Sequence, residues 1–272
     1  GSGGPIRNAQ AAVQAGPGWQ VTPSTFALGT LAPGATTKVH TTLTASATGG
    51  ATAVTATLSF NINGIQDVAT GGASVSVPYA DLASSFDNAG ITDDTNPAPS
   101  PDFAGFDGGG TSFSAQGLAA AGLTPGATVT ADGAQLTWPD VTPGRPDNTM
   151  ARGQSINAGK SGSKLTFLTA ANNDPQTGTI TVHYTDGTVA TPQLNVGNFW
   201  FPAGVSGNPP NTPVAAVNYA NYPNGSSGHT VYVFAASIPL DPAKTVRDIT
   251  LPALSDVKGY HAALHIFAMT VS

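Results

Sequence analysis

All the carboxylate side chains of this chain are aspartates, and five of them lie in one stretch. The sequence has 15 acidic residues, none of them glutamate. Asp87, Asp93, Asp94, Asp102 and Asp107 lie within a segment rich in Gly, Pro and Asn. Short carboxylate side chains in such a loop suit oxygen ligation of a hard cation such as calcium better than acid-base catalysis.

The sequence therefore predicts a structural calcium site in this segment. The predicted ligands are Asp87, Asn88, Asp93, Asp94 and Asp107, with backbone carbonyls of the glycines after Asp107 completing the shell. The spacing is not that of an EF-hand, whose loop ends in a glutamate. The alternative is that these Asp and Asn side chains make Asx turns and cap the elements that follow them.

Aromatic residues in two loops form a second candidate site, for a sugar. Sugar rings present apolar C–H faces that lie on exposed aromatic rings, while Asn, Asp and Arg bind their hydroxyls. Residues 199–201 are three consecutive aromatics, which cannot all face one core in an extended segment. Residues 218–229 mix tyrosine with asparagine. The predicted ligand-binding residues are Trp200, Tyr219, Asn221, Tyr222, Arg145 and Asp147.

Four of these residues also have an alternative, purely structural role. Trp200 and Tyr219 could cover the ends of a β-sandwich, because large aromatic side chains often serve as core residues. Arg145 and Asp147 lie in a Pro-Gly-rich stretch and could simply fasten a turn.

Catalytic motifs are missing from the sequence. Glycoside hydrolysis by two carboxylates needs an acid and a partner at a defined separation, and no such pair stands out among aspartates that mostly sit in turns. The GxSxG, HExxH and P-loop patterns do not occur. We therefore expect a protein that is not an enzyme.

Composition limits the partners of the chain. Charged residues make up only 9%, and the nine Lys and Arg residues are scattered, so we expect no binding to nucleic acid. No apolar run approaches the ~20 residues that cross a bilayer, so we expect no membrane span. The absence of cysteine means that stability does not come from disulfides, and it does not exclude secretion.

Glycine, proline, threonine and valine together predict an all-β protein of two β-sandwich domains. The chain has 33 glycines and 22 prolines that separate short alternating runs. Residues 1–17 are interpreted as a linker or tag remnant, 18–82 as a first sandwich of some six strands, and 83–272 as a second. In the first domain, alternation predicts strands at residues 39–43, 54–62 and 75–79.

Turn and helix signals add detail to this interpretation. Pro33 and Gly34 predict a type II turn, and Asp186 with Gly187 predicts a type I′ hairpin. Only residues 115–123 favour a short helix, because Ala and Leu favour helix and the following Thr-Pro-Gly ends it.

Two resemblances cover most of the chain. Residues 17–80, with GWQVTPSTFALGTLAPGATTKVH, resemble a small Ig-like module found beside catalytic domains in secreted bacterial glycoside hydrolases. Residues 84–272, with FDNAGITDD, FDGGGTSFSAQGLAAAGLTPG, LTWPDVTPGRPDN and ASIPLDPAKTVRDITLP, resemble a second accessory module of such enzymes. This resemblance implies a jelly-roll sandwich of the galactose-binding type that takes carbohydrate.

The expected function is therefore a non-catalytic accessory region of a secreted carbohydrate-active protein, whose second domain binds a polysaccharide or glycan weakly. The alternative is a structural spacer or folding module that packs against a catalytic domain of the same parent chain and binds no sugar. An enzyme in its own right is the third hypothesis, and the lack of a catalytic motif makes it the weakest.

Overall fold

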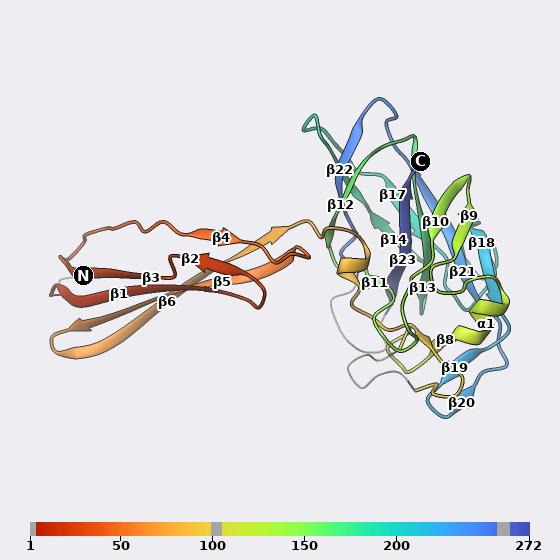
Figure 1. Cartoon of the computed structure of the whole chain (residues 1–272), viewed down its shortest axis with the longest axis horizontal. Coiled ribbons are helices and arrows are strands. Elements are labelled where there is room, and N and C mark those ends of the chain that lie inside the picture. Colours follow the sequence, from red (N-terminus) through yellow and green to blue (C-terminus); the bar gives the residue numbers. More distant parts are fainter. Residues whose placement is uncertain (1–3, 99–104, 255–261) are drawn as a thin grey trace. The chain divides into compact units, whose positions relative to one another are not determined.

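The computed structural model describes residues 4–98, 105–254 and 262–272. The chain divides into two compact units, Gly1–Pro78 and Tyr79–Ser272, so the boundary lies slightly before the predicted one at residue 82. Asp102 lies outside the described residues. The all-β prediction is confirmed, since several antiparallel sheets make up almost all of the regular structure (Figure 1). The finer assignments, Ig-like and jelly-roll, stay predictions.

The first unit consists of a four-stranded antiparallel sheet, with strand order β3-β1-β5-β6, and a two-stranded ribbon that pairs β2 with β4. The strands are β1 (Ile6–Ala15), β2 (Gln20–Thr22), β3 (Thr25–Leu31), β4 (Thr42–Thr44), β5 (Gly50–Ile62) and β6 (Ile65–Val77). The predicted type II turn is confirmed, because Gly34 has a φ of 76° and the Ala35 N–H donates to the Ala32 carbonyl at 3.0 Å.

Residues 6–15, which the sequence analysis places in a linker, instead form strand β1 in the interior of this sheet. The strand pairs with β3 on one side and β5 on the other, and it buries Ala9 and Val13. Alanine and glutamine dominate its sequence, and such residues carry little apolar alternation. Its strand character comes from its two neighbours rather than from its own pattern.

Strand β6 departs from the expected half-buried pattern. Every residue from Ile65 to Ser76 is exposed, including Val75 at 36%, although apolar residues alternate near its end. The strand pairs only with β5 and lies at the edge of its sheet. The predicted strand at residues 39–43 is also shorter than expected, because regular structure there begins at Thr42.

The second unit contains seventeen further strands and two short helices in the described ranges. They are η1 (Ala83–Ser85), β7 (Ile91–Thr92), β8 (Ser112–Ser114), α1 (Ala115–Ala120), β9 (Thr128–Ala131), β10 (Ala134–Thr137), β11 (Thr149–Met150), β12 (Ser155–Ser161), β13 (Lys164–Asn172), β14 (Gln176–Thr179), β15 (Thr181–Tyr184), β16 (Val189–Ala190), β17 (Gln193–Val196), β18 (Thr212–Val217), β19 (Ala220–Tyr222), β20 (Gly225–Ser226), β21 (Val231–Pro239), β22 (Thr245–Thr250) and β23 (Ala263–Val271).

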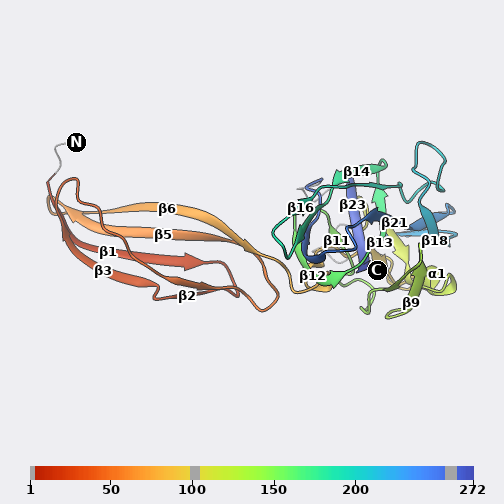
Figure 2. The same ribbon diagram turned by 90° about the horizontal axis from the view of Figure 1, so that it is seen from above.

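A five-stranded sheet of order β11-β23-β13-β21-β18 forms the middle of the second unit. The sheet β12-β22-β15-β16 lies on one side of β13 and β23, while the β9-β10 hairpin and α1 lie on the other (Figures 1 and 2). The small sheet β20-β19-β8-β7 and the pair β14-β17 complete the unit. None of the described helices is both long and apolar enough to span a bilayer.

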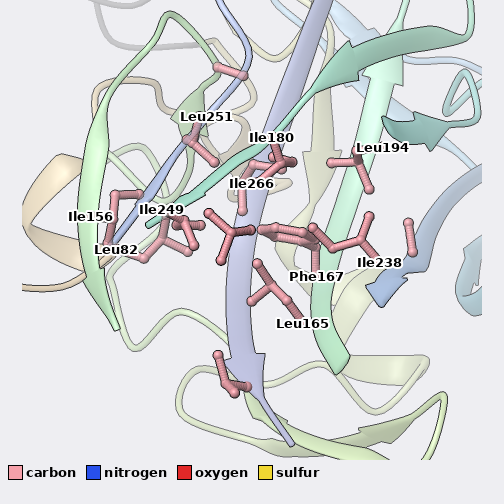
Figure 3. Packing of buried hydrophobic residues seen from close by; sticks show 14 of the residues in the cluster. Leu82, Ile156, Leu165, Phe167, Ile180, Leu194, Ile238, Ile249, Leu251 and Ile266 are labelled. Carbon is pink, nitrogen blue, oxygen red and sulfur yellow. The ribbon is translucent and has the colours of Figure 1, made fainter. Parts of the chain in front are cut away.

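The middle sheet separates two hydrophobic cores. Leu165 and Phe167 of β13 face the first core, where they pack with Ile156 and Ile249 of the neighbouring sheet (Figure 3). Leu168, further along the same strand, belongs to the second core under the β9-β10 hairpin. Because both faces are covered, β13 is buried along nearly its whole length.

The local signals in the second unit are largely confirmed. Helix α1 begins after Ser114, whose Oγ accepts the Gly117 N–H, and it ends before Gly122, which has a φ of 91°. The predicted hairpin also forms, with β15 and β16 on either side of Gly187. Its turn differs in type, because Gly187 has a positive φ and Asp186 does not, which indicates a three-residue loop instead of type I′.

The fully buried Phe167 predicts a large stability loss on truncation. Phe167→Ala leaves a cavity in the first core of the second unit, and we expect it to lower the free energy of unfolding by ~3–5 kcal/mol in urea titrations. Phe201→Ala is the matched control, because Phe201 is only partly buried, and we expect less than half that loss. Equal losses for the two variants would contradict the assigned position of Phe167.

Candidate functional site

The two aromatic loops of the sequence analysis meet at one depression on the second unit. The segment that follows β17 runs parallel to the end of β13, since the Ala171 N–H donates to the Gly197 carbonyl at 2.9 Å and the Phe199 N–H donates to Ala171 at 2.7 Å. Tyr222, the last residue of β19, lines the same depression as this aromatic loop. The depression has a volume of about 230 Å³ and is lined by Asp107, Thr111, Asn173, Asn198, Phe199, Trp200, Phe201 and Tyr222.

Trp200 is held in a defined orientation at this depression. Its ring stacks on that of His229, with centroids 4.3 Å apart and an interplanar angle of 13°. The His229 Nε2 atom lies 2.6 Å from the Trp200 carbonyl oxygen, and the Trp200 N–H donates to Asn198 Oδ1 at 2.9 Å. The prediction that residues 199–201 do not all enter the core is confirmed, because Phe199 is buried whereas Trp200 and Phe201 are partly exposed.

Asn208 is a supporting residue that the sequence analysis missed. Its Oδ1 accepts the Asn198 N–H at 2.8 Å, and its Nδ2 donates to the carbonyls of Asn198 and Phe201 at 2.9 and 2.8 Å. The side chain thus fastens the loop that carries Trp200. A buried asparagine between glycine and proline is a weak sequence signal, because Asn, Gly and Pro are also ordinary turn residues.

Asp107 connects the aspartate segment to the same depression. Its Oδ1 accepts N–H bonds from Gly109 at 2.8 Å and from Thr111 at 3.0 Å, which builds the glycine turn. Gly110 in this turn has a φ of 97°, and a Cβ there would lie 3.0 Å from Pro223, directly after Tyr222. Asp107 therefore makes the Asx turn proposed as the alternative to metal binding, and it also lines the depression.

Tyr219 and Asn221 line a second pocket of about 330 Å³ with Asp94. Asp94 accepts hydrogen bonds from Ser114 Oγ at 2.6 Å and Tyr219 Oη at 2.6 Å, and from Asn221 Nδ2 at 3.1 Å. Burial opposes ionisation of Asp94, but these hydrogen bonds outweigh it and lower its pKa below the ordinary value. Asn221 itself is buried, and Tyr222 on the same short strand lines the first depression instead.

The predicted calcium ligands do not converge in the structure. Asp93 accepts hydrogen bonds from the Thr95 side chain and N–H and from Gln116, which lower its pKa. Asp87 pairs with Arg152 and accepts the Met150 N–H at 2.9 Å. Asp94 and Asp107 belong to the two pockets described above. In the ranges that the structure describes, no group of three or more His, Cys, Asp or Glu residues is placed to hold a metal ion.

Asn88 and Asp147, predicted as a metal ligand and a sugar ligand, are both buried. Asp147 is fully inaccessible and accepts the N–H groups of Gly90 and Ile91 at 3.1 and 2.9 Å. Its location excludes direct contact with a ligand at the surface. Arg145 lines neither of the two pockets, and its N–H donates to the Thr142 carbonyl at 3.2 Å.

A buried polar chain links Asp147 to His265. Asn148 donates from Nδ2 to Asp147 Oδ1 at 2.6 Å, and its Oδ1 lies 2.8 Å from His265 Nδ1. The other ring nitrogen of His265, Nε2, is buried without a hydrogen-bond partner among the described residues. The centroids of the Phe106 and His265 rings lie 4.0 Å apart. Burial raises the pKa of Asp147 to about 7 and lowers the pKa of His265 to about 3.

Comparison of the chain with protein-family models and with curated proteins finds no match in either case. The function of the chain is therefore inferred from its residues and their arrangement.

We expect Asp147 and His265 to make opposite contributions to the pH dependence of stability. These two contributions cancel between about pH 4.5 and 6. The pKa of Asp147 is raised on folding, so its contribution is full below about pH 4 and is lost as the pH rises to about 7. The pKa of His265 is lowered, so its contribution is full above about pH 6.5 and is lost as the pH falls to about 3. Between about pH 4.5 and 6 these two residues hold the same number of protons, one, in the folded and unfolded states.

Single substitutions should expose the two slopes. For Asp147→Asn, we expect the free energy of unfolding to fall by ~1.4 kcal/mol per pH unit as the pH is lowered from about 6 to 4.5. For His265→Gln, we expect it to rise by a similar amount over the same window. Urea titrations at each pH measure the slopes, and parallel curves for both variants would contradict the assignment.

Proposed function

We propose that the second unit binds a glycan at the depression lined by Trp200, Tyr222 and Asp107. We further propose that the chain is a non-catalytic part of a secreted carbohydrate-active protein. The observation that carries the proposal is the meeting of Trp200 and Tyr222, which lie 22 residues apart in the sequence, with a carboxylate and two asparagines at one depression. The resemblance of the sequence to accessory modules of glycoside hydrolases supports the same assignment.

The depression supplies both kinds of contact that a sugar ring needs. Trp200 and Tyr222 offer apolar ring surface, and the stack on His229 holds the indole plane of Trp200 before a ligand arrives. Asn173 and Asn198 offer amide donors and acceptors for hydroxyls. Asp107 uses Oδ1 for its glycine turn, and none of the residues that the structure describes donates to Oδ2, which offers acceptor sites for a sugar hydroxyl.

The same depression supports binding rather than hydrolysis. Among the described residues that line it, Asp107 is the single carboxylate, whereas hydrolysis of a glycosidic bond by the usual route needs two. The volume of about 230 Å³ is smaller than that of most small-molecule sites. We therefore expect recognition of one or two sugar units, with a dissociation constant between about 1 μM and 1 mM.

Truncation of the aromatic residues tests the proposal. We expect Trp200→Ala and Tyr222→Ala each to weaken binding at least tenfold, which is ~1.4 kcal/mol, in calorimetry with the best ligand from a panel of plant, fungal and bacterial polysaccharides. Trp19→Ala is the matched control, because Trp19 lies in the first unit, and we expect it to leave the affinity unchanged.

Two results would contradict the proposal. If the intact chain binds none of the polysaccharides in the panel, the glycan assignment fails, and a spacer that packs against a catalytic domain becomes the better account. If a ligand binds but both aromatic variants retain full affinity, the site lies elsewhere on the chain.

A further inference from the structure

Among the described residues, no strand pairs with part of one edge of β23, the last strand of the middle sheet. Strand β23 pairs with β13 on one side along its whole length. On its other side it pairs with β11 only at His265 and Ile266. Residues 267–271 therefore have no partner strand on that side among the described residues. At ~3.3 Å per residue, this free edge is ~17 Å long.

The register of the sheet shows which backbone groups face the free edge. Ser272 and Lys164 exchange two N–H···O bonds, at 2.9 and 3.0 Å, so this pair is a hydrogen-bonded one. In an antiparallel ladder such pairs alternate with non-bonded pairs. Val271 lies opposite Leu165 and Met269 lies opposite Phe167, so both belong to non-bonded pairs. Their N–H and C=O groups therefore point away from β13 and toward the free edge.

A slot runs along this free edge, and we call it the edge slot. It has a volume of about 570 Å³, and its floor is formed by residues 267–271. One wall comes from β10 and the residues after it, including Gln135 and Thr137. The other wall comes from the segment around η1 and from β12, including Phe86 and Asn157. The walls thus belong to the layers on the two sides of the middle sheet.

The two ends of the edge slot carry opposite charges. Asp140 lines the slot two residues after Trp138, whose ring stacks on that of Phe267 with centroids 4.9 Å apart, so Asp140 lies in the part of the chain near the Phe267 end. Lys160 also lines the slot. The chain just after Lys160 reaches the C-terminus, where the Ser163 N–H donates to the Ser272 carbonyl at 2.7 Å. Lys160 therefore lies in a part of the chain close to the Val271 end.

We propose that the edge slot binds an extended peptide segment of about five residues as an added antiparallel strand. Free backbone donors and acceptors at strand spacing match another strand, and this favours a peptide over a sugar. The antiparallel direction continues the line of β11, which already pairs with β23 in that direction. An acidic residue at the start of the peptide faces Lys160, and a basic residue at its end faces Asp140. This proposal is independent of the glycan site at Trp200.

Two blocked pentapeptides test the proposal. The first is acetyl-Glu-Val-Thr-Val-Lys-amide, and the second has the terminal charges exchanged, acetyl-Lys-Val-Thr-Val-Glu-amide. Each is titrated into the isotope-labelled full chain and followed through the backbone amide signals. We expect the first peptide to cause saturable shifts at Met269 and Val271 and none at Trp200. We expect the second to bind roughly fivefold more weakly or worse.

Two variants make the assignment specific. Met269→Pro removes an N–H that points into the edge slot without breaking a bond to β13, and proline is tolerated on an edge strand, so we expect the folded spectrum to persist while peptide binding is lost. The double variant Asp140→Lys with Lys160→Glu leaves the backbone intact and should reverse the preference between the two peptides. This second variant keeps the test valid if Met269→Pro does not fold.

Three outcomes would overturn the proposal. The first is that neither peptide shifts the amides of the edge slot. The second is that the charge exchange at residues 140 and 160 leaves the peptide preference unchanged. The third is that cellohexaose or xylohexaose shifts the amides of Met269 and Val271 while both peptides fail, which would assign the slot to a glycan. The glycan site at Trp200 is tested by other variants, so the two proposals can fail separately.

Discussion

The burial of the middle sheet on both faces is the constraint on which the second unit depends. Strands β13 and β21 each lie between two partner strands and have hydrophobic cores on either side, so the backbone groups between them and their neighbours can be satisfied only within the sheet or by nearby polar side chains. Thr169 meets this need by donating from Oγ1 to the His265 carbonyl at 2.6 Å. Such strands tolerate few changes of register, because a slip by one residue would exchange the contents of the two cores.

The aspartate segment forms turns and contacts around the two pockets of the second unit. Its four described carboxylates, those of Asp87, Asp93, Asp94 and Asp107, accept N–H, O–H and guanidinium donors from the protein itself, and each contributes to a different turn or contact. Asp107 shapes the glycine turn beside Trp200, while Asp94 gathers Ser114, Tyr219 and Asn221 around one carboxylate. A composition without glutamate fits this use, because the shorter aspartate side chain reaches the backbone one or two residues ahead. The main role of the segment is thus to hold the turns and side chains that line the two pockets in place.

Local pattern was enough to predict the class of the fold, helix α1, the turn at Gly34 and the hairpin at Gly187, since each depends on neighbouring residues. It was not enough to place Asp147, whose stretch has the composition of a surface turn. The burial of Asp147 arises from bonds to Gly90 and Ile91, which lie 57 and 56 residues away. In the same way, sequence indicated two aromatic loops but could not show that Trp200 and Tyr222 share one depression. Strand β1 escaped prediction because its pairing partners, rather than its own residues, make it a strand.

The first residue of the second unit has a mechanical consequence. The Tyr79 N–H donates to the Ser155 carbonyl at 2.7 Å, and the Asn157 N–H donates to the Tyr79 carbonyl at 2.9 Å, in a parallel bridge with β12. Any tension transmitted along the chain from the first unit must enter the second unit through this bridge. Because the two segments run in the same direction, a pull along that direction would load both hydrogen bonds in shear.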